Sequence, residues 1–460
     1  MLNIEYKGLS NINGPIISIE NVENVSYNEV TKIYDKNRHE RTGRVLEISR
    51  NKATIQVFGP TDGLSIADAS VQFLEHSMRI PVGRQLLGRI FNGLGEPRDG
   101  MPQIFSDDLR DINGEPINPY SREYPRDFIQ TGISAMDGMN TLIRGQKLPI
   151  FSGNGLPHNR LTAQIVRQAK LKNNQDGFSI VFAAMGVKYD VAKFFIDNFE
   201  QTGVMENVVM YLSLADDPSI ERLITPRAAL TAAEYLAFDL GHHVLVILTD
   251  MTNYCESLRE VSTTRGEIPS RKGYPGYLYS DLSSIYERAG RLKGNKGSIT
   301  QIPILSMPND DISHPIPDLT GYITEGQIVL ERELFQKGIY PPIAGLPSLS
   351  RLMKDGIGKG MTREDHASLS SQLFASYSQA KDIRSLAAVI GEEELSEADK
   401  IILKFGDKFE QNFLSQEYNE DRTIEQTLDI GWQLLKDLPK EELYRIPNDL
   451  IKKYLPDEET

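Results

Sequence analysis

The stretch from Leu148 to Asn159, LPIFSGNGLPHN, constrains the fold of this chain more than any other. A short apolar run, Leu148 to Phe151, leads into a loop that carries two glycines. Residues 160–170 follow with apolar side chains at a helical spacing, at Leu161, Ile165 and Ala169. Strand, glycine loop and helix in this order are the layout of a phosphate cradle, which predicts an α/β domain with a nucleotide-type site.

The loop has the shape of a phosphate cradle without its chemistry. A working cradle reads GxxxxGK followed by Ser or Thr, with Lys on the phosphates and the hydroxyl on Mg²⁺. Here Pro157 replaces the second Gly and has no N–H to donate, His158 replaces Lys, and Asn159 replaces the hydroxyl. We expect this loop to approach a nucleotide but to hydrolyse it poorly; an ordinary glycine loop is the alternative interpretation. The degenerate nucleotide-binding set that this predicts, with one acid from a later strand, is Ser152, Gly153, Asn154, Gly155, His158, Asn159 and Asp250.

Apolar runs alternate with helical patterns from Gly132 to about Leu349, which is typical of a parallel sheet covered by helices on both faces. One of the helices is expected over residues 215–239. Such a sheet binds its ligand at the carboxyl ends of the strands, where the glycine loop also lies. The expected strands are Leu148–Phe151, Ser179–Ala184, Val208–Leu212, His243–Thr249 and Gln301–Met307.

Two further strand ends bear on catalysis. Asp250 closes the buried run HVLVILTD, where an acid either holds Mg²⁺, as in phosphate-binding ATPases, or caps the following turn. Val187 comes shortly after an earlier expected strand, Ser179–Ala184. A hydrolytic site needs a carboxylate near such a strand end to orient the attacking water. Valine has no proton chemistry, so we predict no hydrolysis by this chain alone. We also predict no metal site.

The segments on either side of the sheet predict two further domains. The first ~75 residues alternate strand signals with turns, as in Ala53, Ile55 and Val57, which predicts a β-barrel. Residues 79–119 are rich in Gly and Pro and are expected to form a linker. From about Arg363 the pattern is helical, which predicts a bundle with apolar faces at Leu369, Leu373 and Tyr377, at Ile402, Phe405, Phe409 and Phe413, and at Leu428, Trp432 and Leu435. The expected domains are 1–75, 76–350 and 351–460.

Composition excludes several classes of protein. A formal net charge of −14 over 460 residues, with no clustered basic segment, argues against nucleic-acid binding. Cys255 is the only cysteine, so no intramolecular disulfide forms, and the N-terminal sequence lacks a signal-peptide pattern, so a cytoplasmic location is expected. No apolar run approaches the ~20 residues needed to cross a bilayer, so we expect membrane association only through other subunits.

Arg351 ends the proline-framed segment PPIAGLPSLSR. A guanidinium stays charged and makes planar bidentate contacts with phosphate, which suits an arginine offered to a transition state. A lone arginine is more commonly part of a surface salt bridge. The segment alone does not decide between the two roles.

The order of these motifs resembles the B subunit of V-type and archaeal-type (V/A-type) rotary ATPases, the non-catalytic subunit of the soluble head, over essentially the whole chain. The stretches that carry the resemblance are Leu86–Gly100 (LLGRIFNGLGEPRDG), Asp127–Asn159, Leu248–Ser262 (LTDMTNYCESLREVS), Arg271–Arg291 (RKGYPGYLYSDLSSIYERAGR) and Pro315–Ile328 (PIPDLTGYITEGQI). The resemblance implies a multidomain α/β fold: an N-terminal β-barrel, a central RecA-like domain with a P-loop-type parallel sheet, and a C-terminal helical bundle.

The resemblance also implies an assembly and a role for Arg351. Three B subunits would alternate with three catalytic A subunits around a central rotor stalk, with peripheral stalk subunits alongside, on the cytoplasmic side of a membrane sector. The arginine after PSLS, here Arg351, would reach into the ATP site of the A subunit, so that ATP or ADP with Mg²⁺ binds at that interface. Catalytic relatives carry Gly-Lys-Thr and a glutamate where this chain has Pro157-His158-Asn159 and Val187.

We therefore predict a regulatory and structural subunit of an ATPase or ATP synthase that moves protons or sodium ions. One departure from the family pattern is Ala344, where PPI[D/N]xxPSLS has Asp or Asn, and its small side chain predicts a looser loop before Arg351. Two alternatives stay open. One is a self-assembling hexameric P-loop ATPase of the secretion or translocase kind, and the other is a scaffold that binds no nucleotide.

Overall fold

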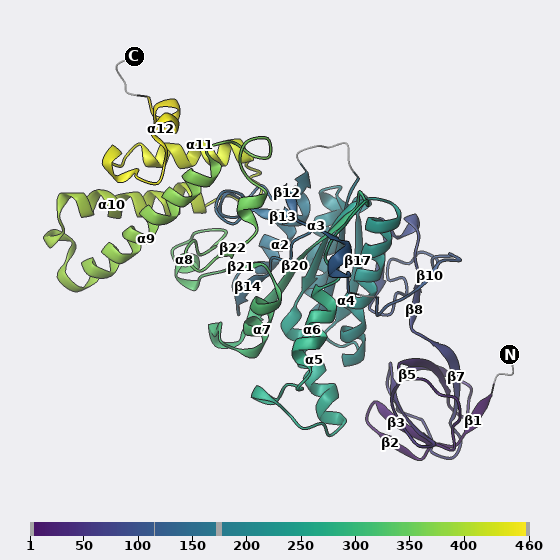
Figure 1. The fold of residues 1–460 in the computed structure, drawn as a ribbon. Coiled ribbons are helices and arrows are strands. Elements are labelled where there is room, and N and C mark those ends of the chain that lie inside the picture. Colours follow the sequence, from purple (N-terminus) through teal and green to yellow (C-terminus); the bar gives the residue numbers. More distant parts are fainter. Residues whose placement is uncertain (1–3, 115, 172–176, 457–460) are drawn as a thin grey trace.

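The computed structural model describes residues 4–114, 116–171 and 177–456. Figure 1 shows a β-barrel at one end, a sheet covered by helices in the middle, and a group of helices at the other end. The outer ends of the first and third expected domains, residues 1–3 and 457–460, lie outside the described residues. None of the described helices is both long and apolar enough to cross a membrane.

The N-terminal barrel is built from antiparallel strands in the order β1-β7-β4-β5-β6-β3-β2. The side chains of Ala53, Ile55 and Val57 are fully buried, as their period of two predicted, but Gln56 between them is buried as well, so β6 does not alternate strictly. They pack against buried residues of the neighbouring strands such as Ile17 and Val45. The strands are β1 (Glu5–Lys7), β2 (Asn11–Asn13), β3 (Ile16–Glu20), β4 (Glu29–Tyr34), β5 (Glu40–Ser49), β6 (Lys52–Val57) and β7 (Ser70–Ser77).

Residues 79–119 are more than a linker, and the linker expectation is wrong where they form three short strands. They hold β8 (Arg79–Pro81), β9 (Ile90–Asn92) and β10 (Leu109–Asp111). Strand β9 pairs in parallel with β17 (Val208–Leu214) and so extends the central sheet. Ile90 and Phe91 pack into the cores on its two opposite faces. The Gly and Pro residues therefore separate short strands that dock onto the central domain.

The central sheet has the order β22-β21-β14-β20-β18-β16-β17-β9, and its strands from β21 to β9 are parallel. All five expected strands are present, which confirms the parallel α/β class. They are β14 (Ile150–Gly153), β16 (Phe178–Val187), β17, β18 (His243–Thr249) and β20 (Ser298–Met307). The remaining strands of the central region are β11 (Arg122–Glu123), β12 (Arg126–Gln130), β13 (Leu142–Arg144), β15 (Lys170–Leu171), β19 (Gly290–Leu292), β21 (Gly326–Val329) and β22 (Leu349–Ser350).

Helices cover both faces of this sheet. In β16, Ile180 and Phe182 face one core and Val181 and Ala183 face the other, so the strand is buried on both sides. Helices α2 and α3 line the first face, and α4 to α7 line the second. The helices are α1 (Ser134–Asp137), α2 (His158–Gln168), α3 (Tyr189–Gln201), α4 (Ser219–Glu234), α5 (Met251–Thr264), α6 (Leu278–Tyr286), α7 (Pro315–Ile323) and α8 (Arg332–Gln336).

Two helix boundaries differ from the prediction. Helix α2 starts at His158 and ends at Gln168, because residues 170–171 form β15, which pairs with β12. The helix expected over 215–239 begins only at Ser219, directly after Pro218, whose ring suits the start of a helix. It continues beyond Glu234 as a π-helical turn, residues 235–239.

The C-terminal domain is helical, as predicted, and shares a core with α2 and α3. Helix α10 ends in a π-helical turn, residues 409–414. All the apolar positions predicted for its faces are buried. The helices are α9 (His366–Ile390), α10 (Glu397–Lys408), α11 (Ile424–Leu435) and α12 (Asn448–Tyr454).

Candidate functional site

The glycine loop lies at the carboxyl edge of the sheet, between β14 and α2. Ser152 on β14 lies opposite Ser306 on β20, so the loop begins in the middle of the parallel sheet. Pro157 is the N-cap of α2 and makes no side-chain cap bond. Since proline also lacks an N–H, the helix start offers one donor fewer to an anion than a glycine would.

Ser152 and His158 satisfy each other across the loop. The Ser152 hydroxyl lies 3.0 Å from His158 Nδ1, and Ser152 is fully buried. Burial lowers the pKa of His158, against the opposing charge of Asp250 and a hydrogen bond to the Leu156 backbone. A neutral imidazole therefore stands where a working cradle has a cation, as the sequence predicted.

Asp250 caps the helix that follows its strand. Its Oδ1 accepts from the Thr252 N–H at 2.7 Å and from the Ser306 N–H at 3.2 Å. Its Oδ2 accepts from the Ser306 hydroxyl at 2.5 Å. The residue is only 8% exposed. Three protein donors engage this carboxylate, so the structure favours the capping role over a magnesium-ligand role.

An ion pair that the sequence reasoning missed covers the loop. Arg332, at the start of α8, donates to Asp310 at 2.8 and 3.0 Å and to the Asn154 carbonyl at 2.9 Å. A Cβ added at Gly153 would lie 2.1 Å from Asp310 Oδ1, so the Asp310 carboxylate rests directly against the loop. Because the Arg332 guanidinium lies at the same place, the pair offers a phosphate no net positive charge. No sequence signal links these residues, because they are far apart along the chain.

The rest of the predicted set is present but does not complete a nucleotide site. Asn154 and Gly155 are exposed, and Gly155 has a φ of +79°, the left-handed conformation that a loop glycine supplies. Val187 ends β16 and is buried among apolar side chains. With no Lys, no hydroxyl at position 159 and an Asp250 that already accepts three hydrogen bonds, these residues do not fit a tightly held magnesium nucleotide.

A cavity of about 600 Å³ adjoins α2, between Arg160 and residues 415–422. The Arg160 guanidinium lies 4.8 Å from the centroid of the Tyr340 ring and 4.9 Å from that of Tyr418. Arg167 lies 4.5 Å from the Tyr418 centroid. Guanidinium groups therefore already stack on the two tyrosine rings that could otherwise stack on a nucleotide base. This arrangement was not predictable from local sequence patterns, because Tyr418 comes from the C-terminal domain.

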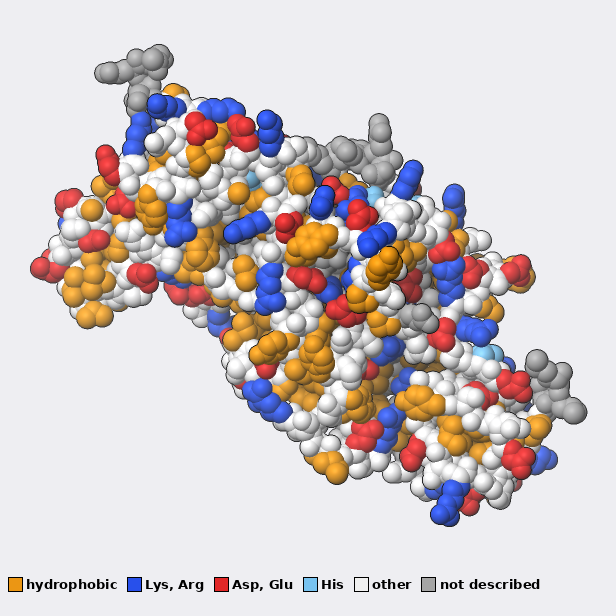
Figure 2. Space-filling model, viewed as in Figure 1, with side chains coloured by type: hydrophobic (Ala, Val, Ile, Leu, Met, Phe, Trp, Pro, Cys, Tyr) orange, Lys and Arg blue, Asp and Glu red, His pale blue; other side chains and the backbone are white. Residues whose placement is uncertain are grey.

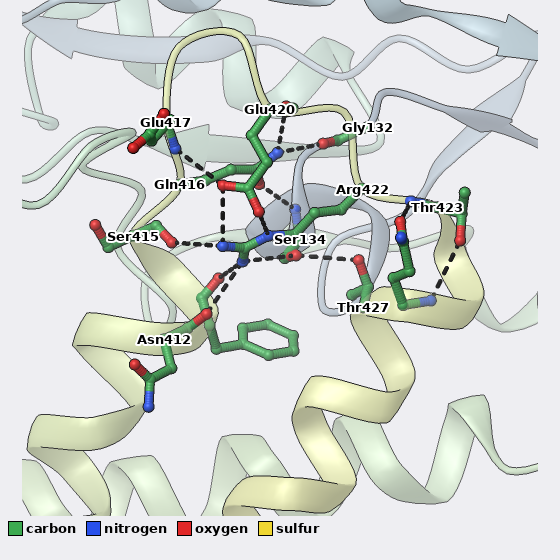
Figure 3. A network of polar contacts seen from close by, with 12 residues as sticks. Gly132, Ser134, Asn412, Ser415, Gln416, Glu417, Glu420, Arg422, Thr423 and Thr427 are labelled. Atoms are coloured by element: carbon green, nitrogen blue, oxygen red, sulfur yellow. Dashed lines mark hydrogen bonds and ion pairs between the residues drawn. The ribbon is translucent and has the colours of Figure 1, made fainter.

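The segment that lines this cavity is fixed to the central domain by Arg422 (Figure 3). Arg422 donates to Glu420 at 2.6 Å, to the Ser415 carbonyl at 3.0 Å and to the Ser134 hydroxyl at 3.3 Å. Gln416 donates to the Gly132 carbonyl at 2.6 Å. These bonds join the loop before α11 to the start of α1, so the cavity has a rigid wall on this side.

Arg351 lies apart from the glycine loop, directly after β22. Its side chain is exposed, and its Nη1 makes one long contact, 3.4 Å, with the Thr324 carbonyl. Among the residues that the structure describes, no carboxylate lies within ion-pair distance of it. Its backbone N–H donates to the Glu325 carbonyl at 2.9 Å, which holds the main chain at this position.

The loop before Arg351 is held without a side chain at position 344. Ala344 is buried, and its N–H donates to the Val329 carbonyl at 2.8 Å. The Ser348 hydroxyl accepts from the Val329 N–H at 2.9 Å, and the Ser350 hydroxyl donates to the Thr141 carbonyl at 2.9 Å. These bonds tie the loop to β21 and to the central domain. They restrain the loop that we expected the small Ala344 side chain to loosen.

The barrel, the parallel sheet with its glycine loop and the helical domain together define a protein of the ATP synthase alpha/beta class. Residues 9–75 match the family described as "ATP synthase alpha/beta family, beta-barrel domain", and residues 132–350 match its "nucleotide-binding domain". Residues 355–455 match the "C-terminal domain of V and A type ATP synthase". The chain belongs to the V/A-type ATP synthase B subunit (beta chain) family.

Relatives support this assignment over nearly the whole length. The chain is 66% identical over 455 residues to the V-type ATP synthase beta chain 2 of Treponema pallidum, covering 99% of this chain and 95% of the relative. It is 61% identical to the V-type ATP synthase beta chain of Halothermothrix orenii, covering 99% and 98%. A solved ATP synthase subunit, NeqB, from Nanoarcheaum equitans superposes with a TM-score of 0.74 at 44% identity, covering 92% of this chain and all of that one.

Proposed function

We propose that this chain is the non-catalytic subunit of its ATP synthase head, and that it offers Arg351 to an ATP site on a neighbouring catalytic A subunit. The observation that carries the proposal is the exposed Arg351 guanidinium on a fixed backbone. An arginine supplied in trans stabilises the charge that develops on the transferring phosphoryl group. The chain would then alternate with A subunits in a three-plus-three ring, with Mg²⁺ and ATP or ADP at the shared interface.

The chemistry of the glycine loop supports the non-catalytic part of the proposal. His158 is held by Ser152, Asp250 is engaged by three donors, and the Asp310 carboxylate rests against Gly153. Each of these contacts stabilises the loop without a phosphate. A self-assembling hexameric ATPase needs the opposite arrangement, with a cation on the phosphates and an acid near the attacking water.

The proposed partners and location follow the same reasoning. The C-terminal end of α9 exposes Leu386, Val389 and Ile390, and Glu392–Glu394 follow it after Gly391. Figure 2 shows hydrophobic and acidic side chains together at this far end of the molecule. We assign this tip to the central rotor stalk, and peripheral stalk subunits and the membrane sector complete the complex on the cytoplasmic side. On the face in Figure 2, acidic and basic side chains are interspersed, which does not favour nucleic acid.

The experiment that tests the proposal is ATP hydrolysis by the chain alone and by the chain mixed with its catalytic partner. We expect no hydrolysis alone and activity on mixing. In the mixed complex, Arg351→Ala should lower kcat by a factor on the order of 10³–10⁵ and leave nucleotide binding nearly intact. Arg351→Lys should recover little, because it loses the planar bidentate geometry.

Lys354→Ala is the matched control, since Lys354 is an exposed cation in the same turn. It should leave kcat near the wild-type value. Unchanged kcat in Arg351→Ala would contradict the proposal and favour a scaffold without a catalytic contribution. Robust hydrolysis by the chain alone would contradict the non-catalytic assignment and favour the hexameric ATPase.

A further inference from the structure

A second cavity, of about 710 Å³, lies between the barrel and the central domain. Figure 1 places the end of α5 beside β2 and β3 of the barrel, and residues of these elements line the cavity together. The barrel contributes Arg44 from β5, and the central domain contributes Arg227 from α4 and Arg265 from the end of α5. The glycine loop, Arg351 and the cavity beside Arg160 are all separate from it.

Two of the three arginines are neutralised inside the chain. Arg227 pairs with Asp281 at 3.0 Å, and Asp281 also accepts from the Tyr254 hydroxyl at 2.5 Å. Arg265 pairs with Glu267 at 3.2 Å. These carboxylates therefore already serve other donors and have little capacity left for a further cation.

Arg44 has no such partner. Within residues 4–114, 116–171 and 177–456 it makes no ion pair, and its buried Nε donates to no acceptor. Burial and the positive charges of Arg227 and Arg265 lower the pKa of Arg44 to about 10, so it stays charged at neutral pH. The buried Nε of Arg265 also lacks an acceptor. An unpaired cation such as Arg44 in a partly enclosed site is costly, and an anion with several acceptor oxygens relieves that cost.

We propose that this cavity binds a phosphate-type oxyanion between the Arg44 guanidinium of the barrel and the Arg265 guanidinium of the central domain. A guanidinium fork matches the spacing of phosphate oxygens, so Arg44 supplies the main contact, and Arg265, whose Nη1 is held by Glu267 at 3.2 Å, faces the anion from the other wall. The anion then bridges the two domains.

The remaining lining residues fit a phosphate with a small organic part. Asn11, Asn13 and Asn28 bring neutral amide donors from the barrel side. Leu223 and Leu258 bring apolar surface from the central domain. Glu47, an exposed carboxylate, also lines the cavity and disfavours ligands with several negative groups. Two ligands present this chemistry, free phosphate and the phosphate ester of a small metabolite. Each offers one phosphate group to the cavity.

The test is isothermal titration of the full chain at low ionic strength and neutral pH, with inorganic phosphate in one arm and glycerol 3-phosphate in the other. We expect one site per chain in at least one arm. Arg44→Gln should weaken that binding by about tenfold or more, since it removes one charge-assisted bidentate contact. Arg50→Gln removes an exposed arginine of the same barrel that does not line the cavity, and should bind as the wild type does.

Thermal unfolding of the same variants supplies a second readout. Without phosphate, Arg44→Gln should be at least as stable as the wild type, because it removes an unpaired cation. With phosphate, the melting temperature should rise for the wild type and for Arg50→Gln only. If Arg44→Gln fails to fold by circular dichroism, Arg44→Lys replaces it and should show a smaller loss of affinity.

The outcomes are distinct. Binding in the phosphate arm that Arg44→Gln weakens assigns the site to free phosphate, and binding only in the ester arm assigns it to a small phosphate ester. No binding in either arm overturns the proposal. Binding that Arg44→Gln leaves unchanged also overturns it, since the anion would then be held elsewhere, for example near Gly153. None of these results depends on Arg351 or on a catalytic partner.

Discussion

Replacing Asp250 tests whether this carboxylate holds the sheet edge together or serves a metal ion. Asp250→Ala removes the acceptor of the Thr252 N–H, the Ser306 N–H and the Ser306 hydroxyl. The Ser306 N–H keeps a second acceptor, the Thr252 hydroxyl at 3.1 Å, so two donors lose their partner completely. At about 2 kcal/mol for each hydrogen bond to a charged group, the free energy of unfolding should fall by about 4 kcal/mol.

Asp250→Asn separates charge from geometry. The amide oxygen can accept from both backbone N–H groups, and the amide nitrogen can donate to the Ser306 hydroxyl, so the charge and the acceptor of the Ser306 O–H are lost while the two backbone bonds stay. We expect a loss of about 1 kcal/mol. Asp216→Ala, which removes an exposed acid after β17 at the same sheet edge, should cost less than about 0.5 kcal/mol.

The assay is urea unfolding followed by far-ultraviolet circular dichroism, with titration of magnesium and ADP in parallel. Trp432 lies in α11, so fluorescence would report on the C-terminal domain instead of the central sheet. Stability that ranks Asp216→Ala, Asp250→Asn, Asp250→Ala from highest to lowest, with nucleotide affinity unchanged, supports the capping role. Unchanged stability in Asp250→Asn, together with loss of magnesium-dependent ADP binding, would refute it.

Three further predictions follow from single contacts. Burial lowers the pKa of His366 to about 4, so the unfolded chain takes up a proton first and stability falls as pH drops below about 6.5. Between pH 7 and 5 the loss should be about 2 kcal/mol by urea unfolding, and His366→Gln should remove it. Gly326→Ala places a Cβ 1.9 Å from the Leu349 carbonyl, so it should lower the melting temperature and the kcat of the mixed complex. Asp310→Ala removes a carboxylate from the glycine loop and leaves Arg332 facing it, so ADP affinity measured by calorimetry should rise about fivefold.

The local patterns of the chain predicted most of the fold. Alternation at Ala53, Ile55 and Val57 indicated a half-buried strand, and the apolar run at residues 243–249 indicated a strand buried on both faces. The docking of β9 was missed because three residues between glycines carry no periodic signal. Pairing with β17 fixes that strand, and pairing is a tertiary interaction that local sequence does not encode.

The site was predictable only where chemistry could be read one residue at a time. A missing lysine at His158 and a missing acid at Val187 are visible in the sequence, and in the structure His158 begins α2 and Val187 ends β16. The Asp310 carboxylate on Gly153 was not predictable, because the loop and its cover come from separate strands. The missing ion-pair partner of Arg44 was not predictable either. It depends on which carboxylates the other arginines bind in the folded chain.

The distribution of paired and unpaired charge explains how a cradle without phosphate chemistry remains stable. A cradle lysine would leave a buried cation at the loop whenever no phosphate was bound, and such a charge is costly. Here His158 is neutral and bonded, and Asp310 has its own arginine, so the loop needs no ligand to fold. Arg44 and Arg351 lack carboxylate partners within the described residues. Under the two proposals, the unpaired Arg44 and Arg351 are therefore better suited to bind an anion than the glycine loop is.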